Sequence, residues 1–509
     1  MLTMTSTLER AARTFGARPA IADARTSSTW AEHTSRVRRA AAILQSHGLQ
    51  PGDRFAVMGL NSHLYSEILH AGYWAGLVPV PINHRLAPPE IRQIVDDAGC
   101  KLLAHCNAFA KVLATPELAR LKLQPLNLES DYERRLTQTE PLAAHDARPD
   151  DLALLLFTGG TTGRSKGVCL SHGNIVSNAM QVALAMRATQ DDRFLHAAPM
   201  FHAADLLGNA FTLVGGSHAY LPTFSGDGAL AALRDRQVTV AMLAPTMIIM
   251  ILQQPNLANY DLASLRLIFY GSSPIDAAWV RRAMTAFPGV DLQHNYGLTE
   301  TSPILTAVDP AEVRAIFAGG NEAILLSAGR PLAGVDLTIR DDDGNDLAPG
   351  EVGEVVVRGP NVAMGYFNRP DETAAAFRDG WFHTGDMGRL DDNGLLFLVD
   401  RKKDMVITGG ENVYTTEVEA AIYLHPNVQE AAVIGVPDEK YGEALFAVVV
   451  PVPGKAISID DIVEHCRGRI GAYKIPRRGD IVTELPKSAM GKILKNELRR
   501  IYAGRETKF

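Results

Sequence analysis

The sequence predicts an α/β protein with parallel sheets, followed by a β-rich segment and a compact α+β segment. Over residues 20–325, short apolar runs alternate with longer amphipathic stretches, a pattern typical of βαβ units. After residue 334 the pattern changes to strands joined by tight turns, as in VDLTIR, DDDGND and EVVVRG. At about 150 residues per domain, a chain of 509 residues suggests three compact units.

The first block, over 20–150, contains alternating strands and helices. The run FAVMGL at 55–60 is apolar and of strand length, which favours a buried strand. Asn61 or Ser62 can cap a helix that runs to Trp74, because both side chains accept hydrogen bonds from helical N–H groups. The remaining elements expected in this block are a strand at 78–82 and a helix at 88–98.

The second block, over 150–325, repeats this pattern. Its apolar runs of strand length are separated by helical patterns, and they lie at 152–157, 194–198, 217–221, 238–243, 265–270 and 290–293. Strands that alternate with helices indicate parallel pairing, since a parallel connection needs a crossover segment. We therefore expect two parallel α/β subdomains.

The last third of the chain has a different composition. The stretch 326–400 indicates an antiparallel, barrel-like piece, and the charged run 400–404 indicates a linker or hinge. Helix and strand patterns follow at 415–424, 431–436, 444–450, near 458–469 and from Gly491. We predict a body over 1–400, a hinge over 401–404 and a small α+β domain over 405–509.

Composition excludes several classes of protein. The formal net charge is −7, whereas a nucleic-acid-binding protein usually has a basic excess. A hydrophobic content of 46% argues against disorder, and four cysteines without a C-x-x-C pair argue against a disulfide scaffold. The N-terminus lacks a signal-peptide core, and no apolar run is long enough to cross a membrane. We expect a soluble, cytoplasmic protein.

The segment 158–167, TGGTTGRSKG, directly follows an expected strand. Its glycines allow an exposed backbone whose N–H groups can point at one anion, while its threonines and Lys166 add further donors. This pattern favours a phosphate-binding loop, although a flexible connector has the same composition. It is not a Walker A loop, because Ser165 stands where that motif needs glycine.

The same loop supports a rival interpretation. Residues 163–167, GRSKG, match the G-x-S-x-G nucleophile elbow, so a serine hydrolase using Ser165 is an alternative. However, the elbow serine must lie on the turn that leaves its strand, and Ser165 lies well beyond the apolar run.

A second polar cluster, NYGLTET at 295–301, lies at the end of an expected strand, where ligands of open α/β sheets gather. Asn295 and Tyr296 offer an amide and a flat ring for a nucleotide base, Thr299 can donate to phosphate, and Glu300 suits Mg²⁺. The loop at Gly271 also follows an expected strand and could lie along a base or substrate. The alternative to a binding role for NYGLTET is a polar loop whose tyrosine only packs against the core.

Three isolated residues carry weaker signals. Asp386, after Thr-Gly, can accept both hydroxyls of a ribose, although T-G-D is also ordinary turn chemistry. His202 lies at a strand-to-helix junction, where a histidine is more often structural than catalytic. Lys492 follows a glycine near the C-terminus, and most such lysines are solvated surface charges.

Taken together, these segments resemble the adenylate-forming superfamily, which includes acyl- and aryl-CoA synthetases, adenylation domains of peptide synthetases, and luciferases. The resemblance covers nearly the whole chain, with the motifs in the family's order. It implies a large N-terminal domain of two parallel α/β subdomains plus a small β-barrel, followed by a small mobile α+β C-terminal domain.

The resemblance also implies ATP as a substrate and Mg²⁺ bound by Glu300. Asn295 and Tyr296 would hold adenine, Asp386 with Arg401 would hold the ribose, and Thr299 would contact phosphate. The nucleotide-binding set implied by the resemblance is Thr158, Gly159, Gly160, Thr161, Thr162, Gly163, Lys166, Gly271, Ser272, Asn295, Tyr296, Gly297, Thr299, Asp386 and Arg401.

The remaining roles implied by the resemblance concern the chemistry and the hinge. Lys492 would bridge the carboxylate and the α-phosphate during adenylation, which brings two anions together, and His202 would line the acyl pocket. Lys403 is similar to the hinge position of the family, whose rotation would exchange the lysine for the thiol. The segment Gly409, Gly410 and Glu411 would border the thiol tunnel.

Three positions depart from the common family pattern. Gly159 replaces a serine and Ser165 replaces a proline in the phosphate loop. Thr415 stands where proline often follows N-V-Y. None of these departures removes an essential charge.

Members of the family that activate amino acids place an aspartate at the position of His202, where it pairs with the α-ammonium group, and no such counter-charge is present here. The resemblance therefore implies a fatty or aryl carboxylic acid as the substrate. The segment 241–250, AMLAPTMIIM, is apolar and suits an acyl chain, or it is ordinary core. Coenzyme A is the expected acceptor, and a carrier-protein thiol is the alternative. The expected partners are small molecules, with neither nucleic acid nor a membrane segment, and a homodimer is left open.

Overall fold

The computed structural model describes residues 3–23, 26–158, 165–272, 275, 277–316, 319–408, 411–438, 441–467, 469–488 and 492–502. The chain divides into two compact units. The first contains Met1–Leu337 and Val357–Phe382, and the second contains Thr338–Val356 and His383–Phe509. The fold is α/β, with a large N-terminal domain and a smaller C-terminal domain, as the sequence predicts.

A four-stranded parallel sheet forms part of the first unit, in the order β4-β3-β5-β6. Its strands are β3 (Arg54–Met58), β4 (Val78–Pro81), β5 (Leu102–His105) and β6 (Gln124–Asn127). Helix α3 (His63–Trp74) begins at Ser62, whose side chain accepts a hydrogen bond from Tyr65 N–H. Helix α4 (Pro88–Ala98) ends at Gly99, which has the left-handed conformation typical of a helix C-terminus. The elements predicted for this block are therefore confirmed.

The larger sheet of the first unit has nine strands, in the order β15-β14-β13-β12-β11-β9-β10-β1-β2. The strands are β1 (Pro19–Ala22), β2 (Ser27–Thr29), β9 (Arg193–His196), β10 (Ser217–Tyr220), β11 (Val240–Leu243), β12 (Leu267–Tyr270), β13 (Asp291–Tyr296), β14 (Thr306–Ala307) and β15 (Arg330–Pro331). Its central strands pair in parallel, as predicted.

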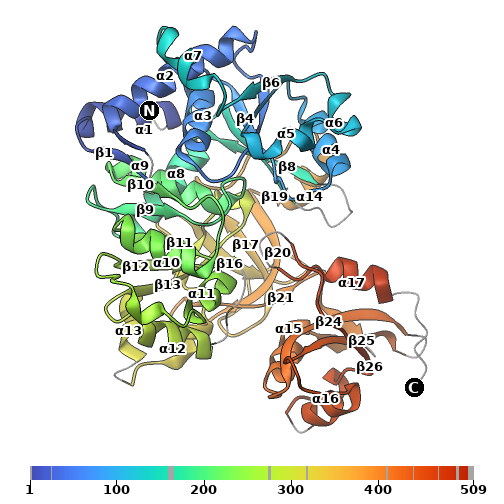
Figure 1. Ribbon diagram of the computed structural model, residues 1–509. Coiled ribbons are helices and arrows are strands. Elements are labelled where there is room, and N and C mark those ends of the chain that lie inside the picture. The colour runs from blue at the N-terminus through green and yellow to red at the C-terminus, as the bar shows by residue number, and fades with distance from the viewer. Residues whose placement is uncertain are drawn as a thin grey trace. The chain divides into compact units, whose positions relative to one another are not determined.

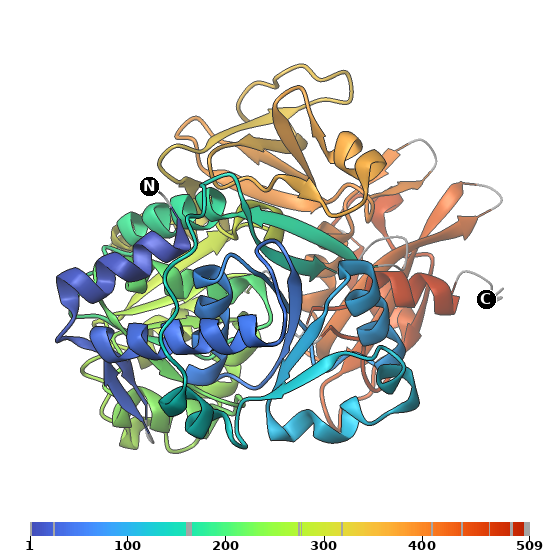
Figure 2. The ribbon, with the colours of Figure 1, turned by 90° about the horizontal axis from the view of Figure 1, so that it is seen from above.

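Strands β1 and β2 of this sheet come from the start of the chain, before the predicted block boundary at residue 150. Strand β1 pairs in parallel with β10, so the start of the chain completes a sheet built mostly from residues after 190. Helix α1 (Met4–Phe15) packs on α8 (His172–Ala185) and α9 (Gly208–Val214). Figure 2 shows the blue N-terminal helices beside the green segment. Periodicity reports only local structure, so this long-range pairing was not visible in the sequence.

One correction concerns the segment at 152–157. It forms β7 (Leu152–Thr158), which pairs antiparallel with β8 (Lys166–Ser171) and does not enter a parallel sheet. Strand β18 (Gly365–Tyr366) completes this three-stranded sheet. An apolar run shows that a strand is buried, but it does not show the direction of its partner.

The helices of the first unit surround these sheets. Figure 1 shows α10, α11 and α12 along the green strands of the nine-stranded sheet. Besides those already given, they are α2 (Trp30–Ser46), α5 (Ala110–Leu113), α6 (Pro116–Ala119), α7 (Tyr132–Gln138), α10 (Gly226–Asp235), α11 (Pro245–Leu252), α12 (Ala277–Ala286), α13 (Pro310–Ala315) and α14 (Pro370–Ala376). The short helices are η1 (Asn107–Phe109), η2 (Ala203–Leu207), η3 (Leu257–Asn259), η4 (Thr299–Thr301) and η6 (Glu322–Leu326).

An antiparallel sheet follows the order β16-β17-β20-β19, with β21 paired to β20. Its strands are β16 (Asp336–Arg340), β17 (Gly353–Arg358), β19 (Phe377–Arg378), β20 (Trp381–Leu390) and β21 (Leu396–Arg401). Most of this sheet belongs to the second unit. The predicted β-rich segment with tight turns is therefore confirmed.

The rest of the second unit is a compact α+β element. Its sheet has the order β23-β22-β25-β24, with β26 parallel to β25. Its elements are β22 (Val406–Thr408), β23 (Glu411–Val413), α15 (Thr415–Tyr423), β24 (Val428–Asp438), β25 (Gly442–Pro451), α16 (Ile459–Cys466), η7 (Ala472–Lys474), β26 (Arg478–Ile481) and α17 (Lys495–Tyr502). The expected terminal helix begins at Lys495 and not at Gly491, which lies outside the described residues.

Two further expectations can be compared with the coordinates. No helix in the described part of the chain is long and apolar enough to cross a membrane. All four cysteines are free, as expected: Cys100, Cys106, Cys169 and Cys466.

Candidate functional site

The first part of the candidate site lies at the carboxyl ends of β12 and β13. Asn295 and Tyr296 are the last two residues of β13 and do not follow it, since the predicted end at residue 293 is too early. The buried side-chain amide of Asn295 donates to the Tyr270 carbonyl at 2.6 Å. A Cβ at Gly271 would lie 2.5 Å from the Asn295 carbonyl oxygen, so only glycine allows this close approach.

The turn after β13 places Thr299 and Glu300 in the short helix η4. A Cβ at Gly297 would lie 1.9 Å from the carbonyl oxygen of Pro303, which keeps the turn tight. The Tyr366 hydroxyl donates to Glu300 Oε1 at 2.9 Å, and the Lys166 ammonium lies 5.0 Å from the centre of the same ring. Tyr366 therefore connects the Glu300 turn with the base of the predicted phosphate loop.

The predicted phosphate loop is the connection of the β7–β8 hairpin, in which Thr158 pairs with Lys166. Its central residues, Gly159, Gly160, Thr161, Thr162 and Gly163, lie outside the described residues. This hairpin differs from a P-loop, which leads from a strand into a helix.

The same hairpin argues against the hydrolase interpretation. A nucleophile elbow requires a helix directly after the serine, whereas strand β8 begins at Lys166, one residue after Ser165.

His202 lies between β9 and η2, at the predicted junction. Burial lowers the pKa of His202 to about 4, so the imidazole is neutral at pH 7. Its buried Nδ1 has no hydrogen-bond partner among the described residues. The nearby carboxylate of Asp205 is bound to His196 at 2.5 Å.

The second unit brings together Asp386, Arg401 and Lys492. Asp386 on β20 lies opposite Arg401 on β21, and Arg401 Nε lies 2.5 Å from Asp386 Oδ1. Asp386 is only 5% exposed, so its carboxylate is held in place by this pair. Gly385 has φ near +70°, a conformation that favours glycine, directly before this residue.

Lys492 lies within the electrostatic reach of this pair. Its side chain is exposed, yet the surrounding protein partly desolvates the ammonium and lowers the pKa of Lys492 to about 8. The positive charges of Arg401 and Lys403 lower it further, whereas Asp386 opposes the shift. Desolvation also lowers the pKa of Lys403. Several cations thus lie around the carboxylates of Asp386 and Asp404, an arrangement that suits an anionic ligand.

The tunnel segment is described only in part. Glu411 is an exposed residue at the start of β23. Gly409 and Gly410 lie outside the described residues.

Ser272 follows Gly271 in the loop after β12 and has a positive φ of 76°.

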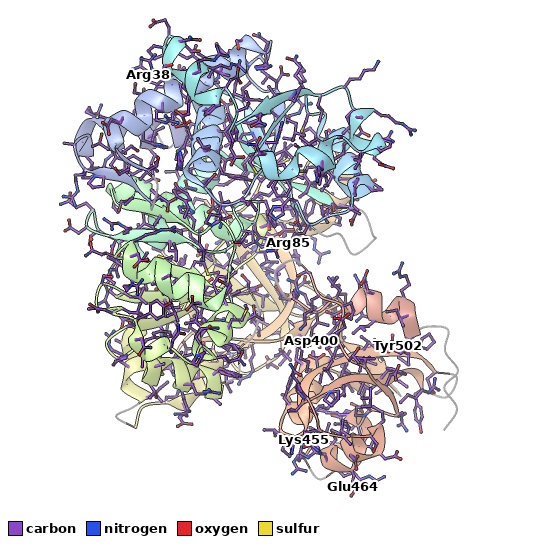
Figure 3. The ribbon with its side chains drawn as sticks, in the orientation of Figure 1. Arg38, Arg85, Asp400, Lys455, Glu464 and Tyr502 are labelled. Carbon is purple, nitrogen blue, oxygen red and sulfur yellow. The ribbon has the colours of Figure 1, made fainter. Side chains whose placement is uncertain are left out.

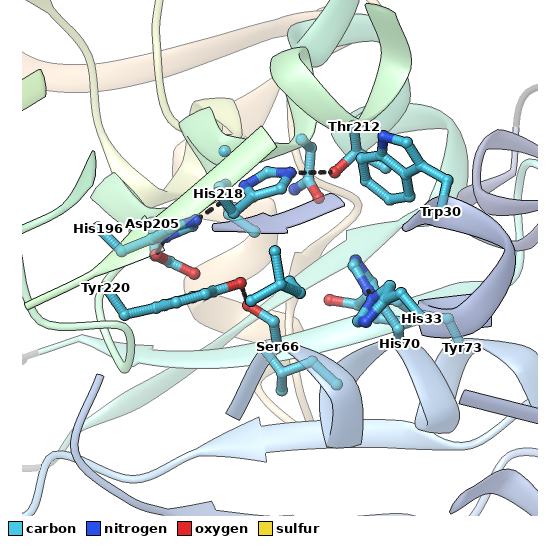
Figure 4. Close-up of a pocket in the computed structure, with 15 residues that line it drawn as sticks. Trp30, His33, Ser66, His70, Tyr73, His196, Asp205, Thr212, His218 and Tyr220 are labelled. Carbon is cyan, nitrogen blue, oxygen red and sulfur yellow. Dashed lines mark hydrogen bonds and ion pairs between the residues drawn. The ribbon is translucent and has the colours of Figure 1, made fainter. Parts of the chain in front are cut away.

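A pocket elsewhere in the first unit holds a cluster of buried histidines (Figure 4). His196 lies 3.0 Å from His218, which in turn contacts Thr212, and His33 lies 3.2 Å from His70. Burial lowers the pKa of His70 to about 4. These rings bond to one another, to Thr212 and to Asp205 within the core, which is a structural arrangement.

Tyr366 is a site residue that no motif in the sequence indicated. Tyr366 is 66 residues from Glu300 in sequence, so no local motif links them. The only signal was the sequence MGYF, whose glycine has a positive φ of 133°.

The residues present fit a Mg²⁺ ion that is bound together with phosphates. The described residues contain no group of three or more side chains that could hold a metal by themselves. Mg²⁺ usually keeps several waters and needs only one or two carboxylates plus substrate phosphates. Glu300 can supply the carboxylate, and Lys166, near the same Tyr366 ring, can bind phosphate.

The fold and this site define a class, the adenylate-forming enzymes. Two family models match the chain: "AMP-binding enzyme" over residues 8–367 and "AMP-binding enzyme C-terminal domain" over residues 417–492. The chain therefore belongs to the AMP-binding enzyme family and is an enzyme.

Similar proteins include several CoA ligases. The chain is 39% identical to a feruloyl-CoA synthase of an Amycolatopsis species over 93% of this chain and 94% of that one. It is 36% identical to an indoleacetate–CoA ligase of Aromatoleum aromaticum, over 93% of both chains. The crystal structure of ATP-bound MatB from Rhodopseudomonas palustris matches with a TM-score of 0.88 at 33% identity, covering 98% of this chain and 99% of that one.

Proposed function

We propose that the protein activates a fatty or aryl carboxylic acid with ATP, forming an acyl-adenylate and pyrophosphate. It then transfers the acyl group to the thiol of coenzyme A and releases AMP. A carboxylate is a poor electrophile, and the mixed anhydride with AMP provides a good leaving group for thiol attack. The CoA ligases among the relatives support this proposal.

The observation that carries the proposal is the placement of Lys492 near Asp386 and Arg401. In the first step a carboxylate must approach the α-phosphate, so two anions are brought together. A preorganised ammonium at this point stabilises the charge that develops, an effect worth roughly 3 kcal/mol. Asp386 would accept the ribose hydroxyls, and Arg401 would keep that carboxylate oriented.

The first unit would bind the rest of the nucleotide. Asn295 and Tyr296 would hold the adenine against Gly271 and Ser272, at the edge where both strands end. Lys166, Thr299 and the glycine-rich hairpin would bind the phosphates. Mg²⁺, when bound by Glu300, would neutralise phosphate charge.

The acid is proposed to lack an α-amino group. His202 is neutral, and Asp205 is already paired with His196, so neither offers a free counter-charge to an ammonium. Ferulate and indoleacetate, after which two relatives are named, both carry an aromatic ring and no α-amino group.

The second step needs access for the thiol. We propose that Lys403 is the hinge, within 401–404, and that the domain over 405–509 turns to remove Lys492 and to present the segment from Gly409 to Glu411 to the thiol.

We place the reaction in the cytoplasm, where four free cysteines persist as thiols. Whether two copies associate is a question for light scattering.

One screen tests the proposed function. Pyrophosphate release is measured with octanoic, 4-hydroxycinnamic and malonic acids, each with and without CoA. We expect release with a monocarboxylic acid and a CoA thioester only when CoA is present. A holo carrier protein offered in place of CoA tests the alternative acceptor. Absence of pyrophosphate release with every acid would overturn the proposal, and labelling of Ser165 by a fluorophosphonate would revive the hydrolase interpretation.

A further inference from the structure

A buried carboxylate lies directly before Arg401 in the chain. Asp400 is 8% exposed and is labelled in Figure 3. Its Oδ2 accepts hydrogen bonds from the Thr415 N–H at 2.5 Å, the Thr415 hydroxyl at 2.7 Å and the Thr416 N–H at 3.4 Å. The carboxylate therefore binds the start of helix α15, where free N–H groups favour an anion.

Thr415 has a second charged neighbour. Its side-chain oxygen accepts a hydrogen bond from Lys495 Nζ at 2.6 Å, while the hydroxyl proton points to Asp400. Lys495 also pairs with Glu419 at 2.7 Å, and Glu419 accepts a hydrogen bond from Val433 N–H at 2.7 Å. Thr415 is fully buried, so one hydroxyl connects two opposite charges away from water.

Lys495 begins helix α17, and the short segment before it carries Lys492. The backbone of this segment is tied to Ser488, whose N–H donates to the Lys492 carbonyl at 2.7 Å. At the other end of α17, Tyr502 packs on Phe446 and donates to Asp480 at 2.9 Å. The helix is therefore anchored at both ends, and Thr415 contacts the end nearer to Lys492.

Asp400 also links these contacts to the Asp386–Arg401 pair of the candidate nucleotide site. Asp400 precedes Arg401, which pairs with Asp386 across β20 and β21. A proline at position 415, which is frequent in the family pattern, would have neither an N–H nor a hydroxyl. The two bonds from Thr415 to Asp400 and the bond from Lys495 therefore depend on the threonine in this chain.

We propose that Thr415 is a positioning residue, which acts through Asp400 and Lys495 to hold Lys492 beside the Asp386–Arg401 pair. Asp400 precedes the predicted hinge over 401–404, whereas Thr415 and Lys495 follow it in the chain. Bonds across the hinge therefore favour the arrangement that is suited to acyl-adenylate formation. Thiol transfer does not need Lys492 in this place. The inference rests on the proposed function, since it assigns Thr415 a role in the first of its two steps.

The test compares Thr415→Val and Thr415→Ser with the wild type. Valine has a similar volume and keeps the N–H, but it removes the hydroxyl from Asp400 and Lys495, whereas serine restores it. The control is Glu417→Gln, on the same helix, which loses the ion pair with Lys474 and does not touch Asp400 or Lys495. Acyl-adenylate formation is measured by pyrophosphate release without CoA, and thioester formation is measured from supplied acyl-adenylate.

For Thr415→Val we expect adenylation to slow about tenfold, the effect of losing one hydrogen bond to a charged group, with thioester formation within twofold of the wild type. The alkaline limit of adenylation should also move to higher pH, because Lys492 leaves the surroundings that desolvate its ammonium and the cations of Arg401 and Lys403 near it. Thr415→Ser should restore both properties, and Glu417→Gln should change neither.

The outcomes separate the positioning role of Thr415 from the proposed function of the protein. Equal slowing of both steps, or adenylation within twofold of the wild type in Thr415→Val, overturns the positioning role. If the wild type forms no acyl-adenylate from any acid, the proposed function fails and this role falls with it. If the wild type is active and Lys492→Ala abolishes adenylation, the result at Thr415 decides the inference alone.

Discussion

The lowered pKa of Lys492 leads to a quantitative expectation for the pH dependence of adenylation. An ordinary lysine has a pKa of about 10.4 and remains charged at pH 9. With a pKa of about 8, Lys492 is mostly charged at pH 7. About one tenth of the molecules carry its charge at pH 9. Because the folded-state pKa is lowered, the cation is lost as the pH rises through 8, and kcat/KM for ATP should fall about tenfold between pH 7 and 9.

The assay is pyrophosphate release without CoA, since kcat/KM for ATP reports the ionisation of the free enzyme. Lys492→Arg keeps its charge over this range, so the alkaline fall should disappear even though its rate is lower. Thioester formation from supplied acyl-adenylate is the control, and its rate should not show this fall between pH 7 and 9. A flat wild-type profile between pH 7 and 9, or the same fall in Lys492→Arg, would refute the reasoning.

Three further predictions follow from single contacts. Gly271→Ala should raise KM for ATP about tenfold, because the new Cβ would push Asn295 from its place. KM is measured by pyrophosphate release, and an unchanged value would contradict this prediction. Tyr366→Phe removes the hydrogen bond to Glu300 and should raise the Mg²⁺ concentration for half-maximal adenylation severalfold, with no change in thioester formation from acyl-adenylate. His70 has a pKa of about 4 in the fold. Its largely desolvated neutral ring therefore stabilises the protein above pH 6.5, and about 2 kcal/mol of the free energy of unfolding should be lost between pH 7 and 5. Urea unfolding of His70→Gln should show a smaller acid loss by that amount, and an identical loss would be evidence against the assignment.

Much of the fold could be predicted because the relevant forces are local. The run at 78–82 and the helical stripe at 88–98 appear within a residue or so of their expected places, since apolar periodicity follows burial of one face. Turn chemistry also acts locally, so the β-rich segment around β16 and β17 was recognised from its tight turns. Boundaries were less accurate, as at the end of β13, because strand ends depend on pairing.

The errors arose where distant segments meet. The pairing of β1 with β10 and the antiparallel hairpin β7–β8 depend on neighbours far along the chain or on strand direction, neither of which periodicity encodes. Tyr366 was missed for the same reason, since its partner Glu300 lies on another element.

The sequence by itself determined the class of fold, the family and the types of residue available for chemistry, because motif order and hydrophobic spacing are properties of the chain. Only the tertiary structure decided the state of those residues. It lowers the pKa of Lys492 by surrounding its amine with protein and cations, and it buries Thr415 between Asp400 and Lys495. Solvation and the distance between charges depend on which segments fold together, so they could not be obtained from residue order.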